Sequence, residues 1–267
     1  MDTVRWIGPA VRLFGLQSQV KLQRLMQYRV DFAVGMVACF ALSATGPVFQ
    51  LLIYARTSGY PGWTWRQILV FQAVLLLSTG IREVFFGDVR PQIERLVERG
   101  EFDRLLLKPF PPLLHLLSGG FAPHALGTLL AGTGTLIWAA RYGGAAPDPV
   151  AYLLFVVFLG AATLLHLSVH ILYCTLTLRW TYPLRLSESM DRVATFGEYP
   201  QEVFPLALRT VFVTVLPLSV ATYWPAQALL GRVNAVAWIA LAGAVALTVV
   251  VVRLWGRQLR HYASAGG

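Results

Sequence analysis

Six apolar stretches constrain the fold of this chain more than any other feature. A helix needs about 20 apolar residues to cross the hydrocarbon core of a bilayer, and each stretch reaches roughly that length. The chain is 56% hydrophobic and only 13% charged, a composition that excludes an ordinary soluble globular domain. We therefore predict an all-α membrane protein with one transmembrane domain over residues 1–267. The predicted spans are Val30–Ala55, Trp65–Phe86, Leu113–Ala140, Val150–Leu178, Val203–Tyr223 and Val233–Trp255.

The first 29 residues have a different pattern. They lack a compact apolar core followed by a small-residue cleavage site, so a signal peptide is not expected. Apolar residues recur at helical spacing, which predicts a basic amphipathic helix lying in the membrane interface. A disordered leader remains the alternative, because Pro9 and Gly15 weaken the pattern. The apolar residues of the pattern are Ile7, Val11, Phe14, Leu22 and Leu25.

The net charge of +9 is distributed by side of the membrane. With six spans and a cytoplasmic N-terminus, 18 of the 22 Lys and Arg fall in cytoplasmic segments. This follows the positive-inside rule, so we predict a multi-pass protein of the inner (plasma) membrane with both termini in the cytoplasm. Lipid is then the expected partner of the basic residues, and nucleic acid is not. The remaining four are Arg56, Arg66, Arg141 and Arg232.

One internal segment, Arg82–Pro109, concentrates charge between two spans, and we call it the charged segment. It holds six of the 22 Lys and Arg and six of the 13 Asp and Glu. Pro91 opens a short amphipathic helix with Ile93, Leu96 and Val97 on one side, and Gly100 is placed to end it. A second short turn follows before Pro109. The pattern favours a surface presented to a partner in water, and an ordinary interfacial helix is the alternative.

The sequence contains no motif of an autonomous enzyme. It has no G-x-x-x-x-G-K-[ST] phosphate loop and no G-x-S-x-G, H-E-x-x-H or C-x-x-C motif. Cys39 and Cys174 both fall within predicted spans, so no disulfide framework is implied. We therefore predict no catalytic residue, no cofactor site and no metal site on this chain.

The fourth predicted span carries His166, His170 and Cys174 at intervals of four residues. Helical spacing puts the three on one face, where they could ligate a soft metal ion. A polar stripe in helix packing is the alternative, because no carboxylate completes the set. A secondary transporter that works without ATP would also need titratable residues near the midplane, and these two histidines are the main candidates.

The last third of the chain is marked by prolines and aromatic residues. Pro217 lies within the fifth predicted span and implies a kink there. Arg209, in the same span, is expected to snorkel toward the cytoplasmic headgroups. The stretch from Pro225 to Gly231 predicts a re-entrant turn before the sixth span.

Several of these motifs together resemble a known family. The run GEFDRLLLKP from Gly100 to Pro109 resembles the signature of ABC-2-type transporter permeases, small six-span subunits usually found as two different chains beside a separate ATPase. The later pieces agree in order and spacing, and the resemblance covers nearly the whole chain. These pieces are Tyr199-Pro200, Phe204-Pro205, Leu208-Arg209, Leu216-Pro217-Leu218 and Tyr223-Trp224-Pro225-Ala226.

The resemblance implies a permease subunit of an ATP-driven exporter. ATP and Mg would be bound by a separate ATPase, and a second permease would complete the pathway; the resemblance favours a different chain, with a second copy as the alternative. The segment between spans two and three is then the coupling helix that contacts the ATPase, and His166, His170 and Pro217 are candidate pathway or packing residues. The ATPase-coupling residues implied are Ile93, Leu96, Val97, Arg99, Gly100, Glu101, Phe102, Asp103, Arg104, Lys108 and Pro109.

Overall fold

In the computed structural model, long helices form where four of the apolar stretches predict them. The structure describes residues 7–142, 148–180, 183–214 and 216–262, which are helices and connecting turns without a strand. Four helices within these ranges are long and apolar enough to cross a membrane, or five if one bent pair counts as a single span. The first, second, fourth and sixth predicted spans each correspond to one such long helix. They are α2 (Arg29–Arg56), α3 (Trp65–Phe86), α8 (Pro149–Thr177) and α12 (Ala235–Arg260).

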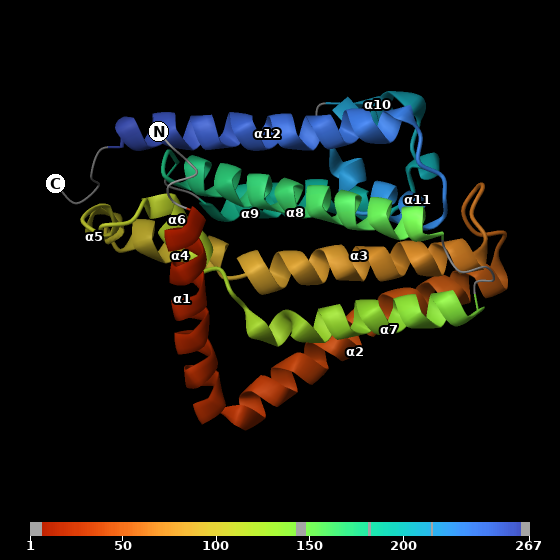
Figure 1. Cartoon of the computed structure of the whole chain (residues 1–267), viewed down its shortest axis with the longest axis horizontal. Helices are drawn as coiled ribbons and strands as arrows, with labels where there is room; N and C mark the ends of the chain where they lie inside the picture. The colour runs from red at the N-terminus through yellow and green to blue at the C-terminus, as the bar shows by residue number, and fades with distance from the viewer. Residues whose placement is uncertain (1–6, 143–147, 181–182, 215, 263–267) are drawn as a thin grey trace.

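The third predicted span, Leu113–Ala140, is not one straight helix. It divides into α6 (Pro112–Ser118), a 3-10 turn at Pro123–Ala125 and α7 (Leu126–Tyr142), with a bend of 49° between the two parts. Gly119 and Gly120 end α6, and Pro123 cannot continue it. The break puts α6 at the end of the bundle, beside α4 and α1, while α7 runs along α3 (Figure 1).

The fifth predicted span, Val203–Tyr223, is wrong. That stretch holds α10 (Leu206–Thr214), a 3-10 turn at Leu218–Val220 and the start of α11 (Tyr223–Leu229), and none of these is long enough to cross. Pro217 begins the turn and separates the short helices, because its ring cannot fit a continuous helix. The structure therefore does not show six membrane-spanning helices in the described ranges.

Instead, the segment that precedes this stretch, between Arg179 and Glu202, runs along the length of the bundle. This stretch contains α9 (Pro183–Ala194) and 3-10 turns at Thr195–Glu198 and Gln201–Val203. It starts near the charged segment, where Asp191 pairs with Arg90, and it ends where Glu202 accepts a hydrogen bond from Trp63, just before α3 begins. The segment Arg179–Glu202, predicted to be cytoplasmic throughout, therefore reaches the other end of α3.

The short helices α10 and α11 enter the bundle and return to the same end. The turn between them reaches the middle of the bundle, where Leu218 and Thr222 line a pocket with Ser78 of α3. The whole of α11 from Trp224 to Leu229 is buried, packed against α8 and α3. This is the burial that a re-entrant segment requires.

Glycines of α7 allow this helix to approach both α2 and α3 closely. A Cβ built on Gly127 would lie 2.1 Å from the backbone oxygen of Met36 in α2. One built on Gly132 would lie 2.9 Å from the backbone nitrogen of Leu77 in α3. At these two positions a small residue is what allows the helices to pack together. Gly134 and Gly160 have open space instead.

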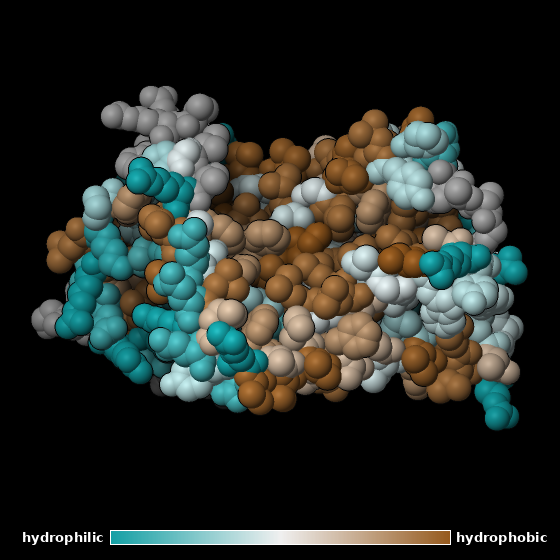
Figure 2. Space-filling view, turned by 60° about the horizontal axis from the view of Figure 1, so that its bottom comes forward, coloured by the Kyte–Doolittle hydropathy of each residue, from teal (hydrophilic) through white to brown (hydrophobic). Residues whose placement is uncertain are grey.

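The two ends of the bundle differ in charge. One end, which we call the charged end, carries α1, the charged segment and the end of α12, and polar residues cover it in the space-filling view beside an apolar middle (Figure 2). The leader is helical, α1 (Ile7–Gln27), and it lies across the bundle axis at this end (Figure 1). Lys21 fixes it there by donating to the Asp88 carboxylate at 2.7 Å and to two backbone oxygens.

Candidate functional site

The charged segment folds into two short helices joined by a glycine turn. These are α4 (Val89–Glu98) and α5 (Phe102–Leu106). Gly100 adopts φ = +64°, in the left-handed region. Its N–H donates to the Val97 oxygen, and the N–H of Glu101 donates to the Leu96 oxygen at 2.8 Å. This is a Schellman ending, so the prediction that Gly100 ends the first helix is confirmed.

The apolar side of the two helices faces the protein's own interior. Ile93 and Phe102 have no exposed surface, and Leu105 is also buried. They form one cluster with side chains of α8 and α12, and Leu96 and Val97 pack against its edge. Burial of this kind favours a fixed position for the segment, because each large apolar side chain contributes about 1.5–3 kcal/mol. The members from α8 and α12 are Ile171, Tyr173, Cys174, Val251 and Trp255.

Aromatic and polar contacts also hold α5 against the end of α12. The Phe102 ring lies 6.5 Å from that of Trp255 and 5.0 Å from that of Tyr262, centroid to centroid. Burial raises the pKa of Tyr262, and the neighbouring Asp103 carboxylate raises it further. The α5 helix is therefore held to the end of α12 on two sides.

The α4 helix is held to α8 and α9 by charged groups. The Tyr173 hydroxyl of α8 donates a hydrogen bond to the Glu94 carboxylate. Arg90 lies over the Tyr173 ring and donates to Asp191 of α9 at 2.6 Å. A displacement of α4 would therefore act on both helices.

What the segment exposes is a short apolar tip, Leu106–Pro109, surrounded by charge. Leu107 is 87% exposed, the most exposed large apolar side chain of the described residues, and Leu106 beside it is 41% exposed. Glu101 and Arg104 are 3.6 Å apart at the rim, a surface pair that contributes little to stability. The eleven predicted coupling residues divide into buried (Ile93, Phe102), half-buried (Leu96, Val97, Glu101, Asp103) and exposed (Arg99, Gly100, Arg104, Lys108, Pro109).

A polar pocket of about 90 Å³ lies deeper in the bundle, between α3, α8 and the turns at Thr195–Glu198 and Leu218–Val220. His166 and His170, the candidate pathway or packing residues, both line it. His166 is hydrogen-bonded to Ser78 at 2.9 Å, and His170 Nδ1 donates to the backbone oxygen of His166. Pro217 does not line the pocket, but it begins the turn that does.

Comparison with known families identifies the protein family of this chain. The family model described as ABC-2 family transporter protein matches residues 40–266, which is most of the chain. The chain belongs to the ABC-2 transporter family. Searches of the curated proteins and of the solved structures found no match. As an ABC-2 protein the chain is a multi-pass membrane subunit of an ABC transporter and is not itself catalytic.

For this ABC-2 subunit the metal alternative finds no support. Among the described residues, no three His, Cys, Asp or Glu side chains come together as possible ligands of a metal ion. Cys174 is fully buried in the cluster that holds the charged segment, whereas the two histidines line the polar pocket. The three residues share a helix face but take part in different environments.

Sequence reasoning missed the junction at the end opposite the charged end. The Glu202 carboxylate accepts hydrogen bonds from Trp63 at 2.8 Å and from Tyr223 at 2.6 Å. Arg209, predicted to snorkel toward the cytoplasmic headgroups, lies in this junction at the end opposite the charged end and donates to the backbone oxygens of Glu202 and Phe204. No sequence signal separates Glu202 from the other acidic residues of a polar stretch.

Proposed function

We propose that this ABC-2 subunit is the permease of an ATP-driven exporter whose charged segment docks on a separate cytoplasmic ATPase. The charged end then faces the cytoplasm, with both termini on that side. ATP and Mg would be bound by the ATPase, and a second permease, either a different chain or a second copy, would complete the pathway.

The observation that carries the proposal is the division of the charged segment into two sides. Ile93 and Phe102 are buried and would transmit movement rather than touch the partner. The exposed Leu107, with Arg104 and Lys108 beside it, has the form of an apolar anchor within a polar rim, as in many protein interfaces. Closure of the ATPase would then displace α4 and α5 together with the ends of α8 and α12.

Co-purification tests the docking step. The tagged chain would be purified from membranes of its source cell in mild detergent, and the ATPase in the eluate measured by mass spectrometry and ATP hydrolysis. Leu107→Glu buries a charge in the proposed interface, so we expect about tenfold less ATPase than for wild type. Leu107→Met keeps the apolar anchor and should retain it.

Two outcomes would overturn different parts of the proposal. Recovery of the wild-type chain without any ATPase would contradict the ABC coupling itself. Equal ATPase recovery with Leu107→Glu and Leu107→Met would contradict the tip as the docking point. Replacing Glu101 and Asp103 together by Ala should lower ATP-dependent transport while membrane insertion stays intact, because Asp103 also helps to hold α5 against Tyr262.

The direction of transport has its own test. An exporter predicts that cells lacking the chain retain a compound that wild-type cells release into the medium. Comparison of cell extracts and media for small molecules and lipids would detect it. A compound that is instead depleted inside the deletion cells would indicate import.

A further inference from the structure

A groove of about 530 Å³ lies between the ends of α8 and α12 at the charged end. It is separate from the tip of the charged segment and from the polar pocket. Each helix contributes residues at the same intervals, i, i+3, i+4 and i+7, and both helices run toward the charged end. From α8 and its end come Leu172, Thr175, Leu176 and Arg179, and from α12 and its end come Leu254, Arg257, Gln258 and His261.

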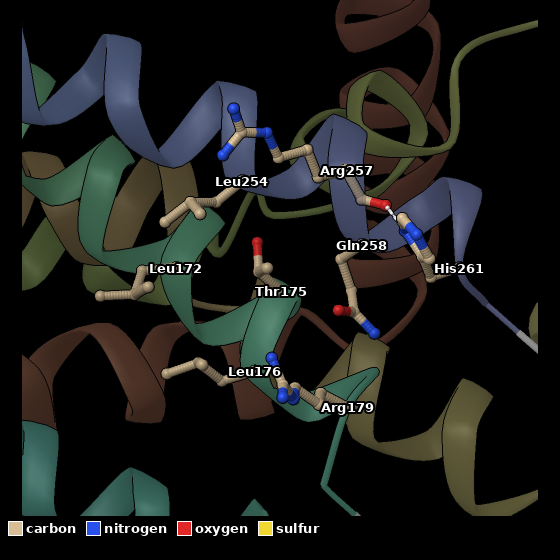
Figure 3. Close-up of a pocket in the computed structure, with 8 residues that line it drawn as sticks. All are labelled: Leu172, Thr175, Leu176, Arg179, Leu254, Arg257, Gln258 and His261. Atoms are coloured by element: carbon tan, nitrogen blue, oxygen red, sulfur yellow. Dashed lines mark hydrogen bonds between the residues drawn. The ribbon is translucent and has the colours of Figure 1, made fainter.

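The two stripes change from apolar to basic in the same direction. Figure 3 shows Leu172 and Leu254 toward one end of the groove and Arg179 and His261 toward the other. The leucines belong to the membrane-spanning parts of their helices, and Arg179 follows the end of α8. If the charged end lies at the membrane surface, as the proposed function has it, the groove joins an apolar wall in the membrane to cationic groups at the level of the headgroups.

The cationic groups of the groove are not neutralised by the protein. No carboxylate lines the groove, and within the described part of the chain neither Arg179 nor Arg257 makes an ion pair. Both side chains are exposed. His261 turns one ring nitrogen to the backbone oxygen of Arg257 at 2.9 Å, which leaves its other nitrogen free to face a ligand.

We propose that this groove binds one anionic phospholipid, with an acyl chain along Leu172, Leu176 and Leu254 and the phosphate at the basic end, held by the exposed side chain of Arg179 or of Arg257, which extend to opposite sides of the groove (Figure 3). Arginine suits a phosphate because its planar guanidinium donates two parallel hydrogen bonds. Basic pockets between spanning helices at a membrane surface are suited to such headgroups. The apolar wall favours a lipid over a free anion, since a soluble phosphate gains nothing from the leucines.

The simplest competing explanation is that the arginines only balance the partial negative charge at the helix ends. Arg260 provides the matched comparison, because it lies in the same last turn of α12 and does not line the groove. Arg253 lies one turn earlier and is also outside the lining. A pair of substitutions at these two positions removes the same charge without touching the proposed site.

Native mass spectrometry of the purified chain in detergent, titrated with phosphatidylglycerol or phosphatidylcholine, tests the site. We expect one phosphatidylglycerol to be retained in preference to phosphatidylcholine. The double variant Arg179→Gln, Arg257→Gln should lose roughly tenfold in retention, and Arg253→Gln, Arg260→Gln should behave like wild type. Equal losses in the two double variants, or no preference for the anionic lipid, would overturn the proposal.

A second pair of variants keeps every charge. Leu254→Trp should fill the groove and lower phosphatidylglycerol retention, whereas Val252→Trp places the same bulk outside the lining. Both proteins would be compared by thermal unfolding, and equal retention in two folded variants would contradict the acyl-chain position. Glycerol 3-phosphate in excess distinguishes the ligand source: displacement of the lipid by this soluble headgroup would identify an anion site instead and overturn the lipid proposal.

Discussion

The helices α2 and α3 have nearly the same hydropathy and opposite surroundings. Yet 56% of the most apolar stretch of the extended helix Trp65–Glu98, which begins as α3, is buried inside the protein, against only 11% of the corresponding stretch of α2. Apolar composition therefore specifies that both cross the membrane, while packing decides which one forms the centre of the bundle.

The difference follows from what lies around each helix. The α3 helix contacts α2, α7, α8 and α11, whereas α2 packs mainly against α7 and makes smaller contacts with α3, α1 and the turn Pro123–Ala125. The exposed face of α2 must be covered by lipid or by another membrane protein, since it cannot face water. A permease partner would naturally use such a face.

The largest expected effect is a cavity in α3. Phe71 has no exposed surface, and Phe71→Ala should lower the free energy of unfolding by about 3–5 kcal/mol. Phe40→Ala in α2, where the ring is 45% exposed, should cost less than about 1 kcal/mol. Unfolding in mixed detergent micelles measures both, and equal losses would break the distinction between the two helices.

A smaller effect is expected from the close contact of α7 with α3. Gly132→Ala adds a methyl group that must displace the backbone around Leu77, so we expect a loss of about 1–3 kcal/mol. Gly134→Ala, two residues along the same helix, meets open space and should be neutral or slightly stabilising. If both substitutions are neutral, the contact between α3 and α7 is looser than the structure indicates.

The smallest expected effect is a change in tryptophan fluorescence at the exposed face of α2. Val37 is 62% exposed, so Val37→Trp should fold normally and its fluorescence should fall in bilayers containing brominated lipid. Trp at Val74, fully buried in α3, serves as the shielded comparison where that variant folds. Quenching of the α2 tryptophan that disappears when a second permease is co-expressed would show that a protein covers this face.

Hydropathy predicted the four long helices because each long apolar run corresponds to one uninterrupted helix. It failed between Arg179 and Gly231, where the chain passes along the bundle in short pieces. The segment that contains α9 is polar on one side, so its sequence predicts a loop. The apolar residues around Pro217 belong to short helices that enter the bundle and return to the same end. Length and hydropathy cannot separate an apolar segment that crosses from one that turns back.

The candidate sites were predicted to different degrees. Gly100 ends the first helix of the charged segment as predicted, because a helix ending depends on local residues. The start was misplaced, since α4 begins at Val89 and not at Pro91. Which residues of that segment face inward was not predictable, since Phe102 meets Trp255 and Tyr262 only in the folded protein. The groove between α8 and α12 likewise depends on two stripes that are about 80 residues apart in the sequence and become neighbours through packing.

The Lys21 ammonium has a consequence for how the protein sits in its membrane. It joins the crosswise leader helix to Asp88 just before α4 and to the backbone at Gly119 and Phe121, where the third span bends. A force applied to α4 would thereby be shared with α1, which lies across the bundle axis. If α1 lies in the membrane interface, as its sequence predicts, the lipid surface would resist tilting of α1, and the bundle could change its internal shape without tilting as a whole.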